Sequence, residues 1–433
     1  HNPRLAMDVV RYIHAADLHL DTPCLGLARE TAQGEHLARL LREATFTALE
    51  RLFRLCETEK PHFLVLAGDI YNEENHSVKA QLALRDGCRR LEAVGVRVFL
   101  AHGNHDPLNS QLTTLTWPDN VTVFGPEVES RTVEQDGRPL AVVHGISHAR
   151  LRENRNLARL FRRDAEKGCF QLGVLHCTLE GQAKADRYAP CSLEDLKAAG
   201  LDAWALGHVH EGQILSQTPF VAYSGSAQGL HINEPGPRGC LRVSARPTPE
   251  GGYVCQAEPV RLGPVQWALV EADLDGVEQL DVVETRLAAA LEAAAEATPP
   301  GCEALIARLR LCGRTGLDTL LRDPTHQTDL IERLEALQTA TPGVWIKDMQ
   351  ASTSPLLDME AALAREDLLG EVLRLAQNLE DQPEALAALA DTALAPLYGH
   401  GQLRKLLSPV DAANRRALLE EARRLCTDLL EAR

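Results

Sequence analysis

Five short polar clusters contain the residues of this chain that could do chemistry. Each cluster follows an apolar segment that is typical of a buried strand, such as residues 96–101. Together they supply carboxylates, imidazoles and one amide but no thiolate, a mixture that suits manganese, iron or zinc better than calcium or a pure magnesium site. We therefore expect two divalent metal ions. The clusters are Asp17-Leu18-His19, Gly68-Asp69, Gly103-Asn104-His105-Asp106, His176 and Gly207-His208-Val209-His210.

The spacing within two clusters predicts that paired side chains converge. Asp17 and His19 are two residues apart on backbone that we predict to be extended, so both side chains should point to the same face. His208 and His210 repeat this spacing. Asp69 could bridge two ions, while Asn104 offers a carbonyl oxygen and His176 another imidazole. Four histidines lie near these clusters but outside them, and we expect them to serve packing or the surface. They are His14, His102, His144 and His148.

The order of the predicted elements places these clusters at one edge of a sheet. Strands at 9–15, 63–67 and 96–101 alternate with helices at 36–56 and 78–94, which predicts an α/β layer fold. In such folds ligand sites gather at the carboxyl ends of the strands. A hairpin with its turn at Asp136-Gly137 follows. Further strands are predicted at 172–175, 203–206, 220–223, 240–244 and 253–257, the last three closing a second sheet.

The remaining sequence divides into two smaller parts. Residues 266–349 alternate strand, helix, strand, helix and strand, which predicts a small α+β domain. From residue 355 the chain is rich in Leu, Ala and Glu and predicts a helical tail broken at Pro383, Pro396 and Pro409. We interpret the residues before Met7 as an extension. The expected domains are 7–260, 264–352 and 355–433.

Composition limits the environment and the partners of the protein. The formal charge of −16 over 433 residues is concentrated after Cys240, where 19 basic residues face 31 acidic ones, against 26 and 30 before it. Two divalent ions would add positive charge to the first part, so its site could still attract phosphate. The 11 cysteines are scattered, which favours reduced thiols in a cytoplasmic protein. No apolar run approaches the ~20 residues of a membrane span.

In this order the five clusters resemble the calcineurin-like metallophosphoesterase superfamily, over about residues 7–245. The resemblance implies an α/β protein: a four-layer α/β/β/α sandwich with a small α+β capping domain and a helical C-terminal tail. It also implies that two ions activate a water for in-line attack on a phosphodiester. His105 is then the catalytic candidate, steadying the phosphoryl oxygens and protonating the leaving alkoxide. By the same resemblance the first metal is held by Asp17, His19 and His210, Asp69 bridges, and the second metal is held by Asn104, His176 and His208.

Longer stretches resemble the SbcD-type DNA repair exonucleases, especially their YhaO-like bacterial branch. They are residues 13–21, the turn Gly145-Ile146-Ser147 and the turn Tyr223-Ser224-Gly225-Ser226. That resemblance implies DNA as substrate, manganese as metal, an SMC-like ATPase gripped by the C-terminal part, and a homodimer. Two positions depart from the family pattern: Asn72 stands where many relatives have His or Asp, and Ser224 stands where proline is usual.

Alternatives remain open at this point. A helix predicted over 150–163 could present a phosphate-contacting strip, or it could be a solvated helix paired with Glu153, Asp164 and Glu166. A phosphatase or phosphodiesterase for a small nucleotide or lipid would use the same metals. A third possibility is a binding subunit that docks its acidic tail on an ATPase. The arginines of the predicted helix are Arg150, Arg152, Arg155, Arg159, Arg162 and Arg163.

Overall fold

The computed structural model describes residues 9–24, 34–72, 77–110, 115–181, 186–337, 342–399 and 410–431. The chain forms two compact units. The first comprises His1–Glu271, Leu287–Arg310 and Asp329–Gln350, and the second comprises Ala272–Arg286, Leu311–Thr328 and Ala351–Arg433. The domain boundaries expected from sequence stay a prediction. The extension before Met7 and the break at Pro409 lie outside the described residues.

The first sheet of unit one has the order β12-β11-β1-β2-β3-β4. β1 pairs in parallel with β2 and antiparallel with β11. Every residue of β2 is buried, and its continuous apolar run is typical of a parallel strand covered on both faces. The strands are β1 (Val10–Ala15), β2 (Phe63–Ala67), β3 (Arg97–Ala101), β4 (Val121–Val123), β11 (Gly239–Pro247) and β12 (Tyr253–Arg261).

The second sheet has the order β5-β6-β7-β8-β10-β9. The predicted hairpin is confirmed between β5 and β6. Asp136 and Gly137 form its turn with φ of 51° and 72°, the left-handed values that a tight hairpin turn requires. The strands are β5 (Glu129–Gln135), β6 (Arg138–Gly145), β7 (Phe170–His176), β8 (Ala203–Gly207), β9 (Gln213–Gln217) and β10 (Phe220–Tyr223).

One sequence expectation about the sheets is wrong. We expected the strands at 240–244 and 253–257 to join the second sheet, but β11 and β12 extend the first one. Tyr12 of β1 lies opposite Val243 of β11. An alternating apolar pattern predicts that a strand exists and which face is buried, but it does not specify the neighbouring strand.

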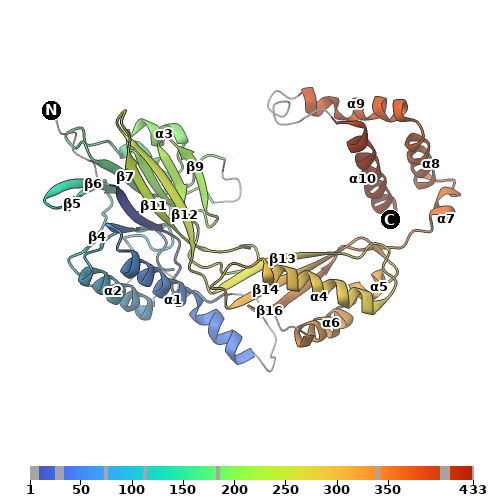
Figure 1. Ribbon diagram of the computed structural model, residues 1–433, viewed down its shortest axis with the longest axis horizontal. Coiled ribbons are helices and arrows are strands. Elements are labelled where there is room, and N and C mark those ends of the chain that lie inside the picture. The colour runs from blue at the N-terminus through green and yellow to red at the C-terminus, as the bar shows by residue number, and fades with distance from the viewer. Residues whose placement is uncertain are drawn as a thin grey trace. The chain divides into compact units, whose positions relative to one another are not determined.

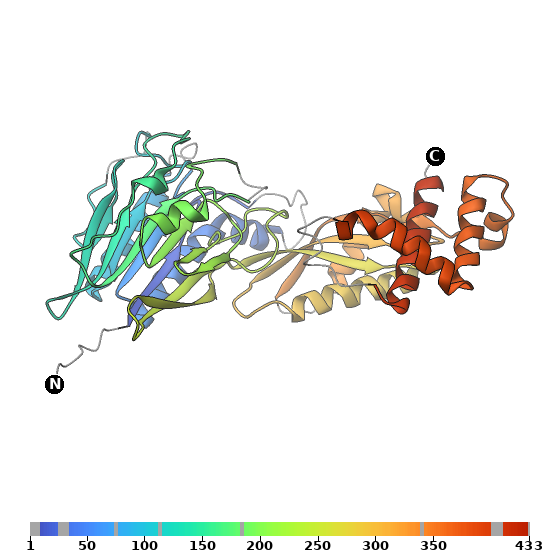
Figure 2. The ribbon, with the colours of Figure 1, turned by 90° about the horizontal axis from the view of Figure 1, so that it is seen from above.

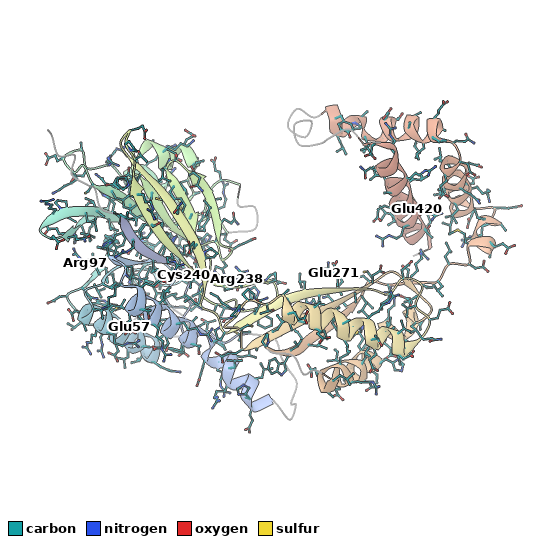
Figure 3. The ribbon with its side chains drawn as sticks, viewed as in Figure 1. Glu57, Arg97, Arg238, Cys240, Glu271 and Glu420 are labelled. Atoms are coloured by element: carbon teal, nitrogen blue, oxygen red, sulfur yellow. The ribbon has the colours of Figure 1, made fainter. Side chains whose placement is uncertain are left out.

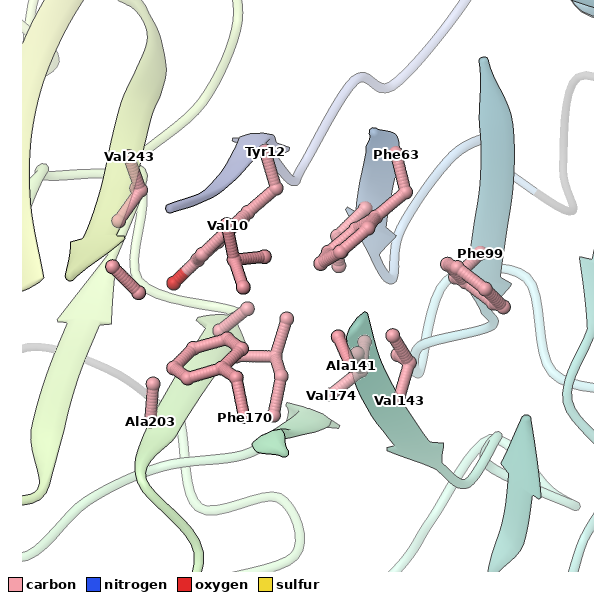
Figure 4. Close-up of a cluster of buried hydrophobic side chains, with 14 of the residues drawn as sticks. Val10, Tyr12, Phe63, Phe99, Ala141, Val143, Phe170, Val174, Ala203 and Val243 are labelled. Carbon is pink, nitrogen blue, oxygen red and sulfur yellow. The ribbon is translucent and has the colours of Figure 1, made fainter. Parts of the chain in front are cut away.

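The two sheets pack face to face and helices cover both outer surfaces (Figures 1 and 2). Between the sheets, Tyr12 stacks on Phe63 with ring centroids 5.2 Å apart, and Phe170 closes against Tyr12 from the other sheet (Figure 4). Outside the first sheet lie α1 (Gly34–Glu59) and α2 (Val78–Ala93), and outside the second lie α3 (Leu193–Ala198) and the 3-10 turn η2 (Leu157–Leu160). The predicted four-layer α/β/β/α sandwich is confirmed.

The arginine-rich helix predicted over 150–163 is wrong. This segment, all of it described, is irregular apart from η2. The carboxylate of Glu153 accepts the backbone N–H of Arg155 at 3.0 Å, which diverts that N–H from a helical ladder. Leu157 and Phe161 are fully buried against the second sheet. Tertiary packing therefore overrides the helical spacing of the arginines.

Unit one also contains most of a three-stranded sheet with the order β13-β14-β16. Its strands and helices follow the strand-helix alternation predicted for residues 266–349. The first strand begins inside the core of unit one, where Val265 and Trp267 pack with Leu37 and Leu41 of α1. The elements are β13 (Val265–Asp273), α4 (Leu280–Glu296), β14 (Ala304–Cys312), α6 (Pro324–Leu337) and β16 (Gly343–Ala351).

The second unit contains the helical tail. Pro383 starts α9 at a position where a proline needs no N–H partner. Pro396 does not break the chain as expected but lies inside α9, one turn before its end, where the helix loses a single hydrogen bond. Among the described residues no helix is long and apolar enough to span a bilayer. The elements are β15 (Arg314–Thr315), α5 (Asp318–Arg322), β17 (Ser354–Pro355), α7 (Met359–Leu363), α8 (Leu368–Glu380), α9 (Pro383–Gly399) and α10 (Ala412–Glu431).

Candidate metal centre

The carboxyl ends of five strands bring the predicted site residues together. His176 ends β7, and the other ligands follow β1, β2, β3 and β8 within a few residues. The backbone N–H of Asp17 donates to Gly68 O at 3.0 Å, and that of His19 donates to Asp69 O at 3.1 Å. Asp17 and His19 have φ of 51° and 42°, so the expected extended backbone is wrong. Their side chains converge because the chain turns sharply after β1, not because of strand alternation.

Asp17, His19 and His210 form the first group of possible metal ligands, with one ligand atom of each within 4.8 Å of the others. The Nε2 atoms of the two histidines lie 3.2 Å apart. His19 Nδ1 donates to Asn72 Oδ1 at 2.8 Å, and His210 Nδ1 donates to the Glu234 carboxylate at 2.5 Å. Because each Nδ1 is the donor of its hydrogen bond, the lone pair of each ring in its neutral form is on Nε2, and the two Nε2 atoms face each other. A cation between them relieves this conflict.

Asp69, His176 and His208 form the second group. His176 Nδ1 donates to Ala67 O at 3.0 Å, while its Nε2 faces Asp69 Oδ2 at 3.2 Å and Asn104 Oδ1 at 3.0 Å. His208 Nε2 donates to a backbone carbonyl at 2.8 Å, which leaves Nδ1 as its free lone pair. The second group therefore also gathers lone pairs of oxygen and nitrogen around one point.

The titration behaviour of the metal-free site follows from this crowding. Burial alone would lower the pKa of His176, but the charge and hydrogen bond of Asp69 raise it to about 9. Burial alone would raise the pKa of Asp69, yet the positive charge of His176 holds it well below its usual range. Burial, and then the charge of His176, lower the pKa of His208 to about 4. In the metal-free protein a proton on His176 therefore occupies the place between His176 and Asp69 where a metal ion would bind.

Two carboxylates connect the groups to the surrounding backbone. Asp17 accepts the backbone N–H of His208 at 3.1 Å, and Asp69 Oδ1 accepts that of His105 at 2.9 Å. Both carboxylates are 1% exposed, and burial raises the pKa of Asp17. The donor set fits two divalent cations. The bridging role of Asp69 and the identity of the metal stay predictions, with manganese expected and iron or zinc as alternatives.

His105 lies at the edge of this centre. Its side chain is exposed, and its ring centroid is 5.1 Å from that of His19 at an interplanar angle of 82°. Only its backbone N–H is engaged with Asp69. The imidazole can therefore reach a substrate without leaving the metal ligands unsupported. Its catalytic role stays a prediction.

The four histidines that we expected to serve packing or the surface lie outside both ligand groups. Burial lowers the pKa of His14 to about 4, and its Nε2 bonds Leu206 O at 3.0 Å. His148 Nε2 bonds His176 O at 2.7 Å. His102 Nδ1 lies 3.0 Å from Asp106 Oδ2, and His144 lies between Ser130 and Gln171. These rings hold backbone and side chains around the centre.

Sequence reasoning missed the residues that support the ligands. Asp106, inside the Gly-Asn-His-Asp cluster, is buried and accepts the N–H groups of Gly103 at 2.8 Å and Ile70 at 2.9 Å. It ties together the loops after β2 and β3. The sequence marks Asn72 only by its departure from a family pattern. Glu234 is 24 residues from His210, and no motif marked it.

Comparison with known proteins agrees with this geometry. Residues 10–212 match the family described as calcineurin-like phosphoesterase, and residues 267–354 match the middle domain of metallophosphoesterase YhaO. An uncharacterized metallophosphoesterase YhaO of Bacillus subtilis is 38% identical over 234 residues, which is 54% of this chain and 56% of that protein.

Two archaeal proteins are more distant. A DNA double-strand break repair protein Mre11 of Aeropyrum pernix is 27% identical, over 52% of this chain and 55% of that protein. Another Mre11 of the same description, from Methanocaldococcus jannaschii, is 24% identical, over 42% of this chain and 50% of that protein. The chain spans about half the length of the curated relatives it matches. By the motif order, the sandwich and these matches, the chain is similar to the calcineurin-like phosphoesterases over residues 10–212 and to metallophosphoesterase YhaO over residues 267–354.

Proposed function

We propose that this protein is a metal-dependent phosphodiesterase that hydrolyses DNA. The observation that carries the proposal is the convergence of two ligand groups beside the exposed imidazole of His105. Bound there, two divalent ions would neutralise phosphate charge and make a water molecule a stronger nucleophile. We propose manganese as the native metal, because imidazole and carboxylate ligands without thiolate suit it.

The residues of the chain would hold and complete this chemistry. Asp17, His19 and His210 would hold one ion, and Asp69, His176 and His208, together with Asn104, would hold the other. Because the Asp69 carboxylate accepts the His105 N–H, the His105 ring is kept close to the ligands without being one of them. From there it would steady the phosphoryl oxygens and donate a proton to the departing alkoxide.

Similarity to the two Mre11 proteins, which are named for DNA double-strand break repair, supports DNA as the substrate. The arginines of residues 150–163 support DNA binding only in part. Arg155 pairs with Glu153, Arg159 with Asp195, and Arg163 with Asp202. Arg150 and Arg152 are exposed and would make the phosphate contacts.

The internal pairing of these arginines also favours a second candidate function. An enzyme for a small nucleotide or lipid phosphoester needs no strip of phosphate contacts, and it would use the same ligands. The two candidates differ in the size of the substrate and not in the chemistry.

The helical tail is the region for which we propose a partner. Leu368 and Leu375 of α8 are 60% and 55% exposed, and Leu425 and Leu429 of α10 are 58% and 64% exposed. Exposed apolar residues at helical spacing are typical of an interaction surface. We propose an SMC-like ATPase as the occupant and a homodimer as the assembly. If binding were the main role of the chain, a His105→Ala protein would still bind that ATPase fully.

The experiment that tests the proposed function compares three substrates in the presence of manganese. They are end-labelled DNA, bis-p-nitrophenyl phosphate and p-nitrophenyl phosphate. DNA hydrolysis that disappears in His105→Ala, but not in the matched exposed-histidine variant His326→Ala, supports a nuclease. Turnover of the small esters alone, with and without an SMC-like ATPase, supports the second candidate.

A further inference from the structure

We infer that Glu234 is a positioning residue for the metal ligand His210, and that Trp267 holds Glu234 in place from outside the catalytic sandwich. The inference rests on the proposed function, because it concerns the same metal centre. It adds a determinant of metal affinity that lies beyond residues 10–212, where the calcineurin-like family match ends.

The contact between Glu234 and His210 is direct. The carboxylate of Glu234 accepts His210 Nδ1–H at 2.5 Å with one oxygen and the backbone N–H of Leu230 at 2.8 Å with the other. Glu234 is 8% exposed, so this pair is largely shielded from water. A carboxylate that accepts the Nδ1 proton fixes which nitrogen of the ring is free for a metal and which way the ring faces.

The loop that carries Glu234 is anchored at the start of β13. Trp267 is fully buried, its indole Nε1–H donates to Gly229 O at 2.8 Å, and its own carbonyl accepts the N–H of Gly236 at 2.9 Å. Trp267 thus bonds both ends of the loop that contains Glu234. It is also the first residue of the stretch that matches the YhaO middle domain.

A buried glutamine strengthens this anchor. Gln228 Nε2 donates to Val265 O at 2.9 Å, and its Oε1 accepts the N–H of the same residue at 3.2 Å. Space around the loop is tight, since a Cβ on Gly229 would lie 3.0 Å from Glu234 O and 3.2 Å from the Trp267 ring. The loop therefore packs directly against the start of β13.

The same loop holds the backbone of the ligand. Arg238, labelled in Figure 3, donates from its guanidinium to His210 O and, at 3.1 Å, to Pro235 O. Glu234 and Arg238 therefore contact His210 from its ring and from its carbonyl. The corresponding ligand of the second group, His208, takes its support from the carbonyl of Asp186 instead. The inference consequently predicts an effect on one metal position only.

The test titrates Mn²⁺ into metal-free full-length protein and follows free Mn²⁺ by electron paramagnetic resonance, which needs no turnover. Glu234→Ala should weaken one of two binding steps by about 10–100-fold, the scale of lost support for a ligand, and leave the other unchanged. Glu234→Gln can still accept the hydrogen bond from His210, so its Mn²⁺ affinity at this step should fall less. Trp267→Phe should weaken the same step by about fivefold, the scale of one neutral hydrogen bond.

Matched controls separate positioning from general destabilisation. Glu250→Gln changes an exposed glutamate in the β11–β12 turn, and Trp345→Phe changes a tryptophan that packs on the same core cluster as Trp267. Both should bind two ions as the parent protein does. Wild-type affinity at both steps in Glu234→Ala, or equal weakening of both steps in Glu234→Gln, overturns the inference. If Trp267→Phe and Trp345→Phe have the same Mn²⁺ affinities at both steps, Trp267 has no part in positioning Glu234.

Failure of the inference and failure of the proposed function give different results. If Glu234→Ala loses one ion and the parent protein hydrolyses none of the three substrates, the positioning role stands and the proposed function fails. If the parent cleaves DNA and Glu234→Ala binds both ions normally, the proposed function stands and the positioning role fails.

Discussion

The Nε2 atoms of His19 and His210 lie 3.2 Å apart although the residues are separated by 191 positions in the chain. Each ring is oriented by an acceptor on its opposite nitrogen, Asn72 for His19 and Glu234 for His210. Two lone pairs at this distance repel unless a proton or a metal ion lies between them. The polypeptide thus holds a cation-binding arrangement before any metal binds.

Replacing Asp69 should remove both ions. Its two oxygens face His105 N–H and His176 Nε2, so Asp69→Ala takes away the proposed bridge and uncovers the positive charge of His176. The metal content after dialysis should fall from two ions to fewer than one. The exposed carboxylate variant Asp119→Ala serves as the control and should keep two. Full occupancy in Asp69→Ala would contradict the bridging assignment.

Replacing the His105 side chain should separate metal binding from turnover. Only the backbone N–H of His105 bonds Asp69, so His105→Ala should keep both ions. Turnover should fall by ~10² or more, the scale of a lost acid or charge stabiliser. Steady-state assays with His326→Ala alongside provide the measurement, and near-normal turnover would remove His105 from the mechanism.

Metal binding should release protons near neutral pH. The pKa of His176 in the metal-free protein is raised to about 9, so this ring is protonated below that pH and must lose its proton to bind an ion. Calorimetric titrations of Mn²⁺ at pH 7.5, in buffers with different ionisation enthalpies, should show at least one proton released. The number should decline as the pH rises past 9. Binding of Mn²⁺ without proton release at pH 7.5 would argue against His176 as a metal ligand.

The arginines of residues 150–163 should not act alike. Arg155 and Arg159 are paired with acids, so Arg155→Ala and Arg159→Ala should leave the salt dependence of DNA affinity unchanged. Arg150→Ala and Arg152→Ala should each reduce the slope of log affinity against log salt by about one. Fluorescence anisotropy at several salt concentrations distinguishes the pairs, and equal slopes for all four variants would place DNA elsewhere.

Asp195 should make stability dependent on pH in the acid range. The Arg159 guanidinium beside it and hydrogen bonds from Ser192 hold its pKa well below the usual range. A carboxylate with a lowered pKa in the folded state stabilises above its unfolded pKa of about 3.9, and the effect is lost as the pH falls below that value. Asp195→Asn should cost about 1 kcal/mol at pH 7, the upper end of the scale for an ion pair at the surface, because the pair with Arg159 is lost. The difference in Tm from the parent should shrink below pH 4.

Much of the sandwich could be read from the sequence because local patterns report it. Residues 172–175 before His176 and residues 203–206 before His208 are continuous apolar runs, and each polar cluster begins where such a run ends. The hairpin at Asp136-Gly137 follows from residues that tolerate positive φ. Residues that are close in the sequence determine these features, so the sequence alone predicts them.

What sequence reasoning missed depends on partners that are distant in the chain. Glu234 reaches His210 only because Trp267 holds its loop, and β11 is placed beside β1 only by long-range pairing. The predicted arginine helix failed because Glu153 takes the N–H of Arg155 and the surrounding apolar residues are buried. No local pattern encodes these contacts.

The central place of β1 in the first sheet has a consequence for biosynthesis. β1 leaves the ribosome well before its antiparallel partner β11, which ends at Pro247. At about 5–20 residues per second, the nascent chain waits roughly 10–50 s between these events. During that time one edge of β1 is open, and until His208 is synthesised Asp17 has no His208 N–H to accept. The candidate metal centre can therefore assemble only late in translation, because its residues after β1 and those after β8 are about 190 positions apart in the chain.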